Sequence, residues 1–303
     1  MSSVRVFHVN AFTRRPYRGN PAGVVLDAER LSEGQMQLLA RELNVGDTAF
    51  LLPADGADHD LRARFFTPRA EVGFVGHATV AAHAVLAAQG LAPRRLQKQG
   101  NDIVAIERRA DAHGTQIAFA QPPPPLRGAI DGERLVALLE TLGIGRDDLD
   151  PRCPPTVAGS RSTRSLIAVR DGTVLTRLRP DLARLAQLSA AGAAPGTFVY
   201  TLQPAVSDCE TEARMFCPAL GINEDPVSGN AHAMLAALLG GLQLLPGGVA
   251  SAGFRARQGH HMGRAGELQV TVQRAGGGIA SVTVSGAAVV VFATSVAVAE
   301  IAA

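Results

Sequence analysis

The sequence predicts an α+β fold of two pseudo-symmetric domains, in each of which a barrel-like sheet surrounds one buried helix. Two similar segments, 76–86 and 229–239, carry this prediction; their first residues are 153 positions apart (229 minus 76). Each opens with glycine and a polar residue and continues as a nearly unbroken apolar run. A helix that is apolar on every side has to be buried on every side. Strand-like segments outnumber helical ones and do not alternate with them, which argues against a parallel doubly wound fold.

The chain has the length of two domains. Its 303 residues correspond to two domains of about 150 residues each. The proline run Pro122–Pro125 cannot lie in a helix or a central strand, so we interpret it as the linker. We therefore predict an N-terminal domain over residues 1–120, completed by residues 288–303, and a C-terminal domain over residues 121–287.

The elements expected in the N-terminal half follow from local patterns. Ser32 can cap a helix that runs to about Leu43 and carries apolar residues on one face. We interpret Gly19–Gly23 as a turn and the polar run Leu96–Gly100 as a surface loop. Runs of β-branched and aromatic residues predict strands over 4–9, 24–26, 48–52, 61–66, 103–106 and 115–119.

The C-terminal half is expected to follow the same plan. Helices are predicted over 132–142 and 181–190, and strands over 165–169, 196–202, 268–272 and 279–284. The last two strands would form a hairpin around Gly276–Gly278. The apolar run Ala287–Ala299 is too short to span a bilayer and is expected to be a strand with a C-terminal extension.

Composition excludes several classes of function. A net charge of +2 without a basic cluster argues against nucleic-acid binding. Lys98 is the only lysine, in a polar run, which argues against a pyridoxal-phosphate Schiff base. No Gly-Lys-Ser/Thr triplet is present, so a Walker-type phosphate loop is excluded. We therefore expect no cofactor and no membrane association.

Cysteine usage points to a reducing cytoplasm. Cys153, Cys209 and Cys217 have no metal-site spacing and cannot all pair with one another. The N-terminus lacks the apolar core of a signal peptide. We therefore expect a cytoplasmic protein.

The N-termini of the two apolar helices are the predicted binding positions for a carboxylate. Backbone N–H groups at Gly76-His77 and Gly229-Asn230 would point at an anion there. The densest polar segment, Asn223–His232, precedes the second helix. Pro226 biases Asp225 to an extended conformation, and a partly desolvated carboxylate near a helix N-terminus suits acid/base chemistry. The alternative is that Asp225 or Ser228 simply caps the helix.

Asp47 and His77 are the other candidates, each with a structural alternative. Asp47 lies between a helix end and a strand and could instead be a turn aspartate bonded to its own backbone. His77 could contact a ligand or cap its helix. No His/Asp/Glu cluster has zinc-site spacing, so we expect no metal, and His260-His261 is assigned no role.

Six short motifs stand out along the chain: Gly19-Asn20-Pro21, Asp47–Phe50, Gly76–Thr79, Asn223–Gly229, Gln258-Gly259 and Met262–Arg264. Together they resemble the phenazine-biosynthesis PhzF-like isomerase family. They occur in the family's order, span the chain from about Val4 to Val291, and are most specific in the Asn-Glu-Asp-Pro-Val-Ser-Gly segment. The resemblance implies the diaminopimelate epimerase fold, with the active site in the cleft between two barrel-on-helix domains.

The resemblance also implies a chemistry. The best-studied member isomerises trans-2,3-dihydro-3-hydroxyanthranilate by moving a proton within the substrate, without metal or organic cofactor. Its proton-shuttling glutamate matches Asp47, its histidine His77, its aspartate Asp225 and its serine Asn230. The epimerase relatives use a pair of cysteines at the N-termini of the two central helices. Here those positions are His77 and Asn230, which argues against a two-cysteine racemase mechanism.

Two departures from the family pattern weaken the expectation of that particular substrate. Gly46-Asp47-Thr48 replaces the usual Ser-Glu-Thr, and the shorter side chain sets the carboxylate back by about 1 Å, a misplacement that can cost about 10²-fold in rate. Asn230 replaces a hydroxyl that can relay protons with an amide that binds a carboxylate but relays protons poorly.

We therefore expect a cofactor-independent isomerase acting on a small carboxylate. Asp47 would be the acid/base, with Asp225 and His77 as further catalytic residues. One alternative is a non-catalytic carboxylate-binding protein, and another is an epimerase or dehydratase of an amino or imino acid. A purely structural protein is a third alternative. Because relatives are often dimers, we also expect a homodimer. The residues expected to bind the substrate are Asn20, Gly76, Ser228, Gly229 and Asn230.

Overall fold

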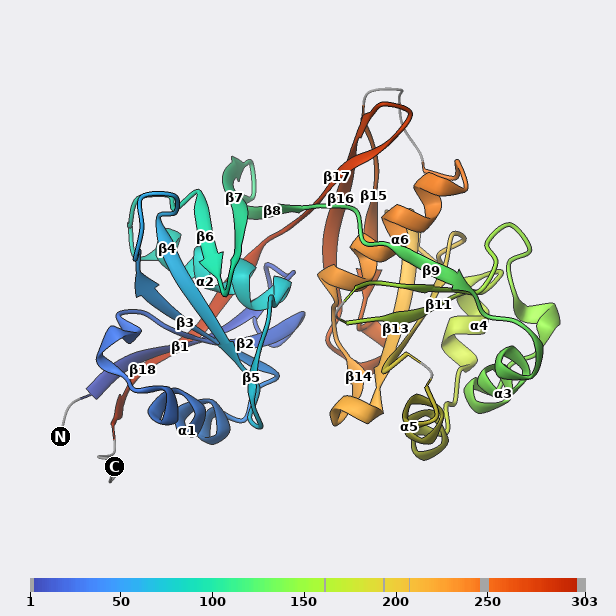
Figure 1. The fold of residues 1–303 in the computed structure, drawn as a ribbon, viewed down its shortest axis with the longest axis horizontal. Coiled ribbons are helices and arrows are strands. Elements are labelled where there is room, and N and C mark those ends of the chain that lie inside the picture. Colours follow the sequence, from blue (N-terminus) through green and yellow to red (C-terminus); the bar gives the residue numbers. More distant parts are fainter. Residues whose placement is uncertain (1–2, 161, 193, 207, 246–250, 299–303) are drawn as a thin grey trace. The chain divides into compact units, whose positions relative to one another are not determined.

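The computed structural model describes residues 3–160, 162–192, 194–206, 208–245 and 251–298 (Figure 1). Contacts between Cα atoms divide the chain into two compact units. Unit 1 comprises Met1–Gln121 and Ser285–Ala303, and unit 2 comprises Pro122–Val284. Among the described helices, none has both the length and the apolarity that a bilayer crossing requires.

Unit 1 contains most of the N-terminal half and the last strand. Its strands are β1 (Ser3–Ala11), β2 (Asn20–Val25), β3 (Asp47–Pro53), β4 (Leu61–Phe66), β5 (Glu71–Val72), β6 (Leu96–Gln99), β7 (Asp102–Asp111), β8 (Gly114–Gln121) and β18 (Ala288–Ala297). Its helices are the 3-10 turn η1 (Ala28–Arg30), α1 (Glu33–Leu43) and α2 (Gly76–Ala88).

Unit 2 contains the remaining elements. Its strands are β9 (Leu126–Ala129), β10 (Thr156–Ala158), β11 (Arg164–Ala168), β12 (Gly196–Thr201), β13 (Thr211–Cys217), β14 (Ile222–Asp225), β15 (Ser251–Gln258), β16 (Gly266–Ala275) and β17 (Gly278–Gly286), which ends just beyond the boundary. Its helices are α3 (Gly132–Leu142), η2 (Arg146–Asp148), α4 (Gly172–Arg177), α5 (Leu182–Ala190), η3 (Pro218–Leu220), α6 (Gly229–Gly241) and η4 (His260–Met262).

The sheet of unit 1 wraps around α2. Strand β1 pairs antiparallel with β18 and β2, β2 parallel with β3, β3 antiparallel with β4, β4 parallel with β6, and β7 antiparallel with β6 and β8. Helix α2 contacts β1, β2, β3, β8 and β18, which include both ends of this series (Figure 1). Nine residues of α2 are buried, on all its sides. The predicted central helix is confirmed in this unit.

Unit 2 repeats the same succession of pairings. Strand β10 pairs antiparallel with β11, β11 parallel with β12, β12 antiparallel with β13, β13 parallel with β15, and β15 antiparallel with β16. The short strands β5 and β14 also match, since each pairs antiparallel with the strand before it and precedes the buried helix. Helix α6 contacts β9 and β16, and ten of its residues are buried. The duplication predicted from the two apolar segments is therefore present in the topology.

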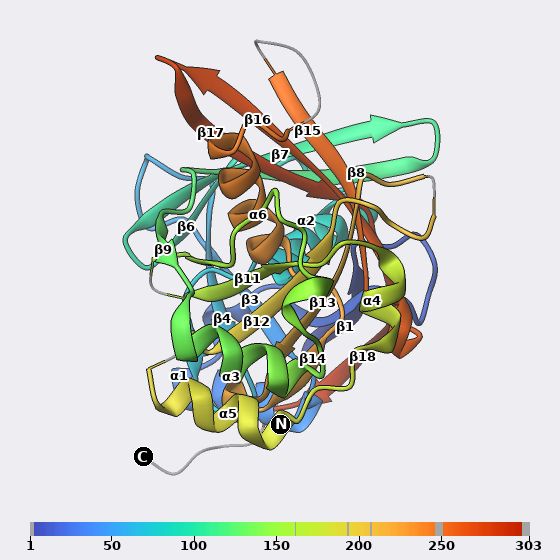
Figure 2. The same ribbon diagram turned by 90° about the vertical axis from the view of Figure 1, so that its right-hand side faces the viewer.

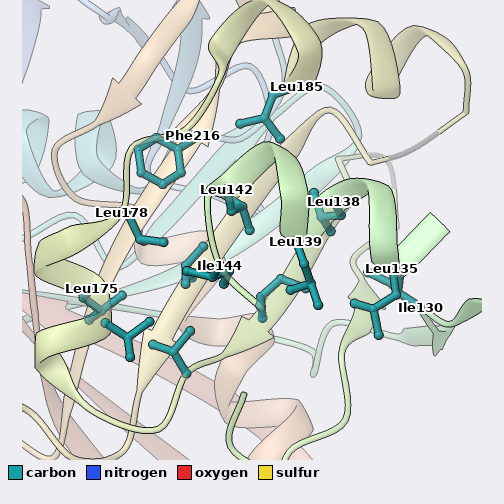
Figure 3. Close-up of a cluster of buried hydrophobic side chains, with 14 residues drawn as sticks. Ile130, Leu135, Leu138, Leu139, Leu142, Ile144, Leu175, Leu178, Leu185 and Phe216 are labelled. Atoms are coloured by element: carbon teal, nitrogen blue, oxygen red, sulfur yellow. The ribbon is translucent and has the colours of Figure 1, made fainter. Parts of the chain in front are cut away.

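The other helices pack on the outside of their sheets. Helices α3 and α5 contact each other on unit 2 (Figure 2), and their leucines join residues of β11, α4, β12 and β13 in one apolar cluster (Figure 3). In unit 1, Met36 and Ala40 of α1 are buried with Leu39 and Leu43 packed beside them. Ser32 forms the capping box of α1 with Gln35, so the predicted N-terminus of this helix is confirmed.

The predicted turn at Gly19–Gly23 is wrong from Asn20 onward, because β2 begins there. Proline is tolerated in this strand because pairing with β3 begins only at Ala22, one residue after Pro21. Only Gly19 has the conformation of a turn, with φ of +63°. A Cβ atom on Gly19 would lie 2.2 Å from the carbonyl oxygen of Ala11, so no other residue fits.

The predicted surface loop at Leu96–Gly100 is also wrong, because Leu96–Gln99 forms β6. Gln97 and Gln99 are buried. The Gln97 amide donates to Thr79 Oγ1 and Gln99 Oε1, and its oxygen lies 3.0 Å from His83 Nε2 of α2. These hydrogen bonds offset the desolvation of the amides and make a polar strand stable against the central helix.

Candidate functional site

In unit 1, two strands and a helix bring together the predicted catalytic residues Asp47 and His77. Asp47 is the first residue of β3, where it lies opposite Ala22 of β2. His77 is the second residue of α2, and its Nε2 atom lies 3.6 Å from Asp47 Oδ2. The His77 side chain is 11% exposed, and the Asp47 side chain is 13% exposed. The pair is thus largely shielded from water.

Burial keeps His77 uncharged at neutral pH. It lowers the pKa of this imidazole to about 4, against the opposing effect of the Pro21 backbone on the ring. The Nε2 atom is buried and makes no hydrogen bond. Asp47 therefore faces a neutral imidazole.

This geometry gives the pair a defined chemical capacity. His77 Nε2 and a carboxylate oxygen of Asp47 face each other at 3.6 Å, which is too long for a direct hydrogen bond. A substrate O–H or N–H placed beside them can donate to the Asp47 carboxylate, and a neutral imidazole can donate or accept through Nε2 according to its tautomer. The arrangement suits a group that takes up and returns a proton.

The N-terminus of α2 has no side-chain cap. Val75 is the N-cap residue, and its side chain makes no capping hydrogen bond. The first turn contains no acidic residue, so its N–H groups and partial positive charge are not neutralised by the helix itself. Gly76 is required here, because a Cβ atom would lie 2.8 Å from Cζ of Phe119. The predicted binding residue Asn20 begins the adjacent β2 and is 4% exposed.

In unit 2, the loop before α6 is held by a side chain to which the sequence assigned no role. The Gln258 amide nitrogen donates to the carbonyl oxygen of Asp225 at 2.6 Å, and its oxygen accepts the N–H of Ser228 at 3.2 Å. Gln258 is fully buried. The adjacent Gly259 has φ of +83°, and its Cβ would lie 2.5 Å from the carbonyl oxygen of Pro226. The Gln258-Gly259 motif therefore supports the connection from β14 to α6, residues 225–228, which we call the Asp225 loop.

The other predicted residues of unit 2 lie at the start of α6. Ser228 is the N-cap, and its Oγ accepts the N–H of Ala231 at 3.3 Å, so the capping alternative describes this residue. Asp225 is the last residue of β14 and is partly buried. Gly229 is buried, and the partly buried Asn230 holds the position in α6 that His77 holds in α2. The predicted residues therefore form two sets, one within each unit.

Comparison with known proteins gives matches over nearly the whole chain. The family of phenazine biosynthesis-like proteins, PhzC-PhzF, matches residues 9–294. The uncharacterized isomerase YddE of Escherichia coli O157:H7 is 40% identical over 292 residues, which cover 95% of this chain and 96% of the relative.

Solved structures agree with this match. The phenazine biosynthesis protein of the PhzF family from Bacillus anthracis is 26% identical, with a TM-score of 0.87 over 98% of this chain and 100% of that one. A hydroxyproline epimerase from Agrobacterium vitis shares the fold, at 13% identity and a TM-score of 0.63 over 97% and 92% of the two chains. The expected fold class is thereby confirmed. The chain belongs to the PhzC-PhzF family of phenazine biosynthesis-like proteins.

Proposed function

We propose that the protein is an isomerase that moves a proton within a small carboxylate substrate, with Asp47 as the acid/base. The enzyme class is supported by the match to full-length relatives named as isomerases. The proton-transfer role of Asp47 is supported by one observation in particular: the Nε2 atom of the neutral His77 faces its carboxylate in a largely buried setting. His77 would accept or orient the proton that Asp47 carries.

The substrate carboxylate would be bound by backbone N–H groups of the uncapped first turn of α2, with Asn20 and Gly76 beside them. In unit 2 we assign catalysis to Asp225 and substrate binding to Ser228, Gly229 and Asn230, on the strength of their place in the family motif. The Ser228 hydroxyl can still donate to a ligand while its oxygen accepts from Ala231. The chemistry proposed needs only these side chains and backbone groups.

Deuterium uptake from D₂O tests this function. The protein would be incubated with dihydroaromatic acids, hydroxyprolines and α-amino acids, and each compound analysed by mass spectrometry beside Asp47→Ala and Asp225→Ala. We expect uptake into one compound class, lost in Asp47→Ala. Saturable binding of a carboxylate without exchange into any compound would contradict an isomerase and favour a non-catalytic binding protein.

Two further properties belong to this proposal. Cys153, Cys209 and Cys217 are all buried free thiols, which supports a reducing cytoplasm as the working compartment.

We also propose a homodimer, which light scattering coupled to gel filtration measures directly. A mass of 31.5 kDa, that of one chain, would contradict the dimer.

A further inference from the structure

Three side chains of unit 2 converge outside the predicted site. Glu212 lies on β13, whereas His260 and His261 form the start of η4. His260 Nε2 is 2.5 Å from Glu212 Oε1, and His261 Nε2 is 3.7 Å from the same oxygen. The Glu212 side chain is 2% exposed, and those of the two histidines 20% and 12%. A carboxylate and two imidazoles are thus gathered in a mostly buried position.

Hydrogen bonding within the cluster accounts for only one of its imidazoles. His260 can donate to Glu212, but His261 Nε2 is too far from the oxygen for a hydrogen bond, and it is buried with no other partner. The two rings lie with centroids 3.8 Å apart. A buried ring nitrogen that faces a carboxylate without bonding to it carries an uncompensated desolvation cost. A cation coordinated by both nitrogens and the oxygen would remove that cost.

The donor atoms lie close enough together to reach one cation. One donor atom from each residue lies within 4.8 Å of the other two. Zinc binds histidine nitrogen and carboxylate oxygen at about 2.0–2.2 Å, which puts tetrahedral ligands about 3.4 Å apart. His261 Nε2, at 3.7 Å from Glu212 Oε1, is close to that value, whereas His260 Nε2, at 2.5 Å, lies at hydrogen-bond distance and would move away from the oxygen to share an ion with it. The other Glu212 oxygen accepts the N–H of Ala205 at 2.9 Å, which orients the carboxylate.

His59 of unit 1 shows how an ordinary histidine–carboxylate contact differs. Its Nε2 lies 3.0 Å from Asp55 and its Nδ1 2.6 Å from Asp58, so the two carboxylates approach opposite sides of the ring. Asp55 is also paired with Arg62 and Lys98. Within the described parts of the chain, only the Glu212 cluster brings three such donors to one point.

We propose that Glu212, His260 and His261 form a binding site for a divalent transition-metal ion of the zinc or cobalt type. Two imidazoles and one carboxylate are a donor set these ions accept, and three protein ligands leave a coordination position for water. The bound ion would tie η4 to β13. Because Gln258 directly precedes this turn, the ion would also stabilise the strand end that supports the Asp225 loop. Metal binding here does not depend on whether the protein is an isomerase.

Cobalt titration tests the site directly. Full-length protein would be treated with a chelator, desalted and titrated with Co²⁺, with visible absorption as the readout, followed by displacement with Zn²⁺. The wild type is expected to bind one ion per chain with a visible d–d band. His261→Gln and His260→Gln should each lower the affinity by more than the ~10- to 100-fold that loss of an outer ligand contact costs. His59→Gln is the matched control and should bind as the wild type does.

The variants separate binding from folding. His261 Nε2 makes no hydrogen bond in the structure, so His261→Gln should keep the wild-type circular dichroism spectrum and thermal midpoint in the absence of metal. Zn²⁺ should then raise the midpoint of the wild type and of His59→Gln but not that of His261→Gln. Absence of stoichiometric Co²⁺ binding by the wild type, or equal binding by His261→Gln, would overturn the proposal.

Discussion

The Nε2 atom of His77 faces the Oδ2 atom of Asp47 at 3.6 Å, and this Nε2 atom is buried without a hydrogen-bond partner. The backbone of Pro21 acts on the same ring. This relationship connects the Gly19-Asn20-Pro21 motif, whose Asn20 begins β2, to the candidate acid/base on β3. It also determines how the site should respond to pH.

His77 is expected to act without titrating near neutrality. Its pKa is lowered to about 4 by burial, so it remains uncharged from pH 5.5 to 8. The rate of deuterium exchange into the accepted compound should therefore show no inflection near pH 6.5 that depends on this residue. Exchange would be measured across that range for the wild type and His77→Gln. A wild-type inflection near pH 6.5 that disappears in His77→Gln would contradict the assignment.

Gln258 is predicted to position the Asp225 loop. Gln258→Met has a similar length but leaves the Asp225 carbonyl and the Ser228 N–H without their partner, each worth about 1–3 kcal/mol when buried. We expect a lower free energy of unfolding in urea and a lower exchange rate. Gln273→Met, at an exposed position of β16, is the control and should change neither. Wild-type stability in Gln258→Met would show that these hydrogen bonds do not support the loop.

Gly76 is predicted to be required for packing at the N-terminus of α2. In Gly76→Ala the new methyl would lie 2.8 Å from the Phe119 ring, which packs edge-on against Phe74 at 5.0 Å. Overpacking of this kind costs about 1–3 kcal/mol. Gly73→Ala, where nothing lies within 4 Å of the added atom, should leave the thermal midpoint within about 2 °C of the wild type. Equal midpoints for the two variants would contradict the steric argument.

Three buried histidines should make the protein sensitive to mild acid. Burial lowers the pKa values of His77, His83 and His232 from 6.5 to about 4. Between these values the unfolded chain binds protons that the folded chain does not, so stability falls as the pH decreases from 6.5 toward 4. The loss near pH 5 is about 1 kcal/mol per pH unit for each histidine.

Urea unfolding at pH 7, 6 and 5 measures this dependence. His83→Gln removes one of the three histidines that contribute to this dependence. The slope of the unfolding free energy against pH should therefore decrease by about one third of the part that the three histidines contribute. The variant can be less stable overall without affecting this comparison, because only the slope is read. An unchanged slope in His83→Gln would show that this residue is not kept neutral by the fold.

The central helices could be predicted from the sequence because their apolar character is local and complete. Segments 76–86 and 229–239 have no polar face, and the capping box of Ser32 and Gln35 is likewise a short-range signal. Strand β6 could not be predicted in this way. Its glutamines are buried because Gln97 bonds to Thr79 and His83 of α2, and a single sequence does not show which distant polar groups will meet.

The same limit applies to the candidate site. Asp47 and His77 can be predicted from their motifs, but the position of Pro21 near the His77 ring becomes visible only when β2 is placed beside β3. Gln258 lies 33 residues from Asp225, and Glu212 precedes His260 by 48 residues (260 minus 212), so neither grouping has a local spacing pattern. The strand pairings bring these residues together.

The exchange rate of Asp47→Asn tests the central proposal most directly. Asparagine keeps the size of the side chain but cannot take up a proton at neutral pH, and loss of a general acid or base costs about 10²- to 10⁴-fold in rate. With the compound identified in D₂O, we expect Asp47→Asn to bind within a few-fold of the wild type and to exchange at least about 10²-fold more slowly. An exchange rate equal to that of the wild type would show that Asp47 does not carry the proton.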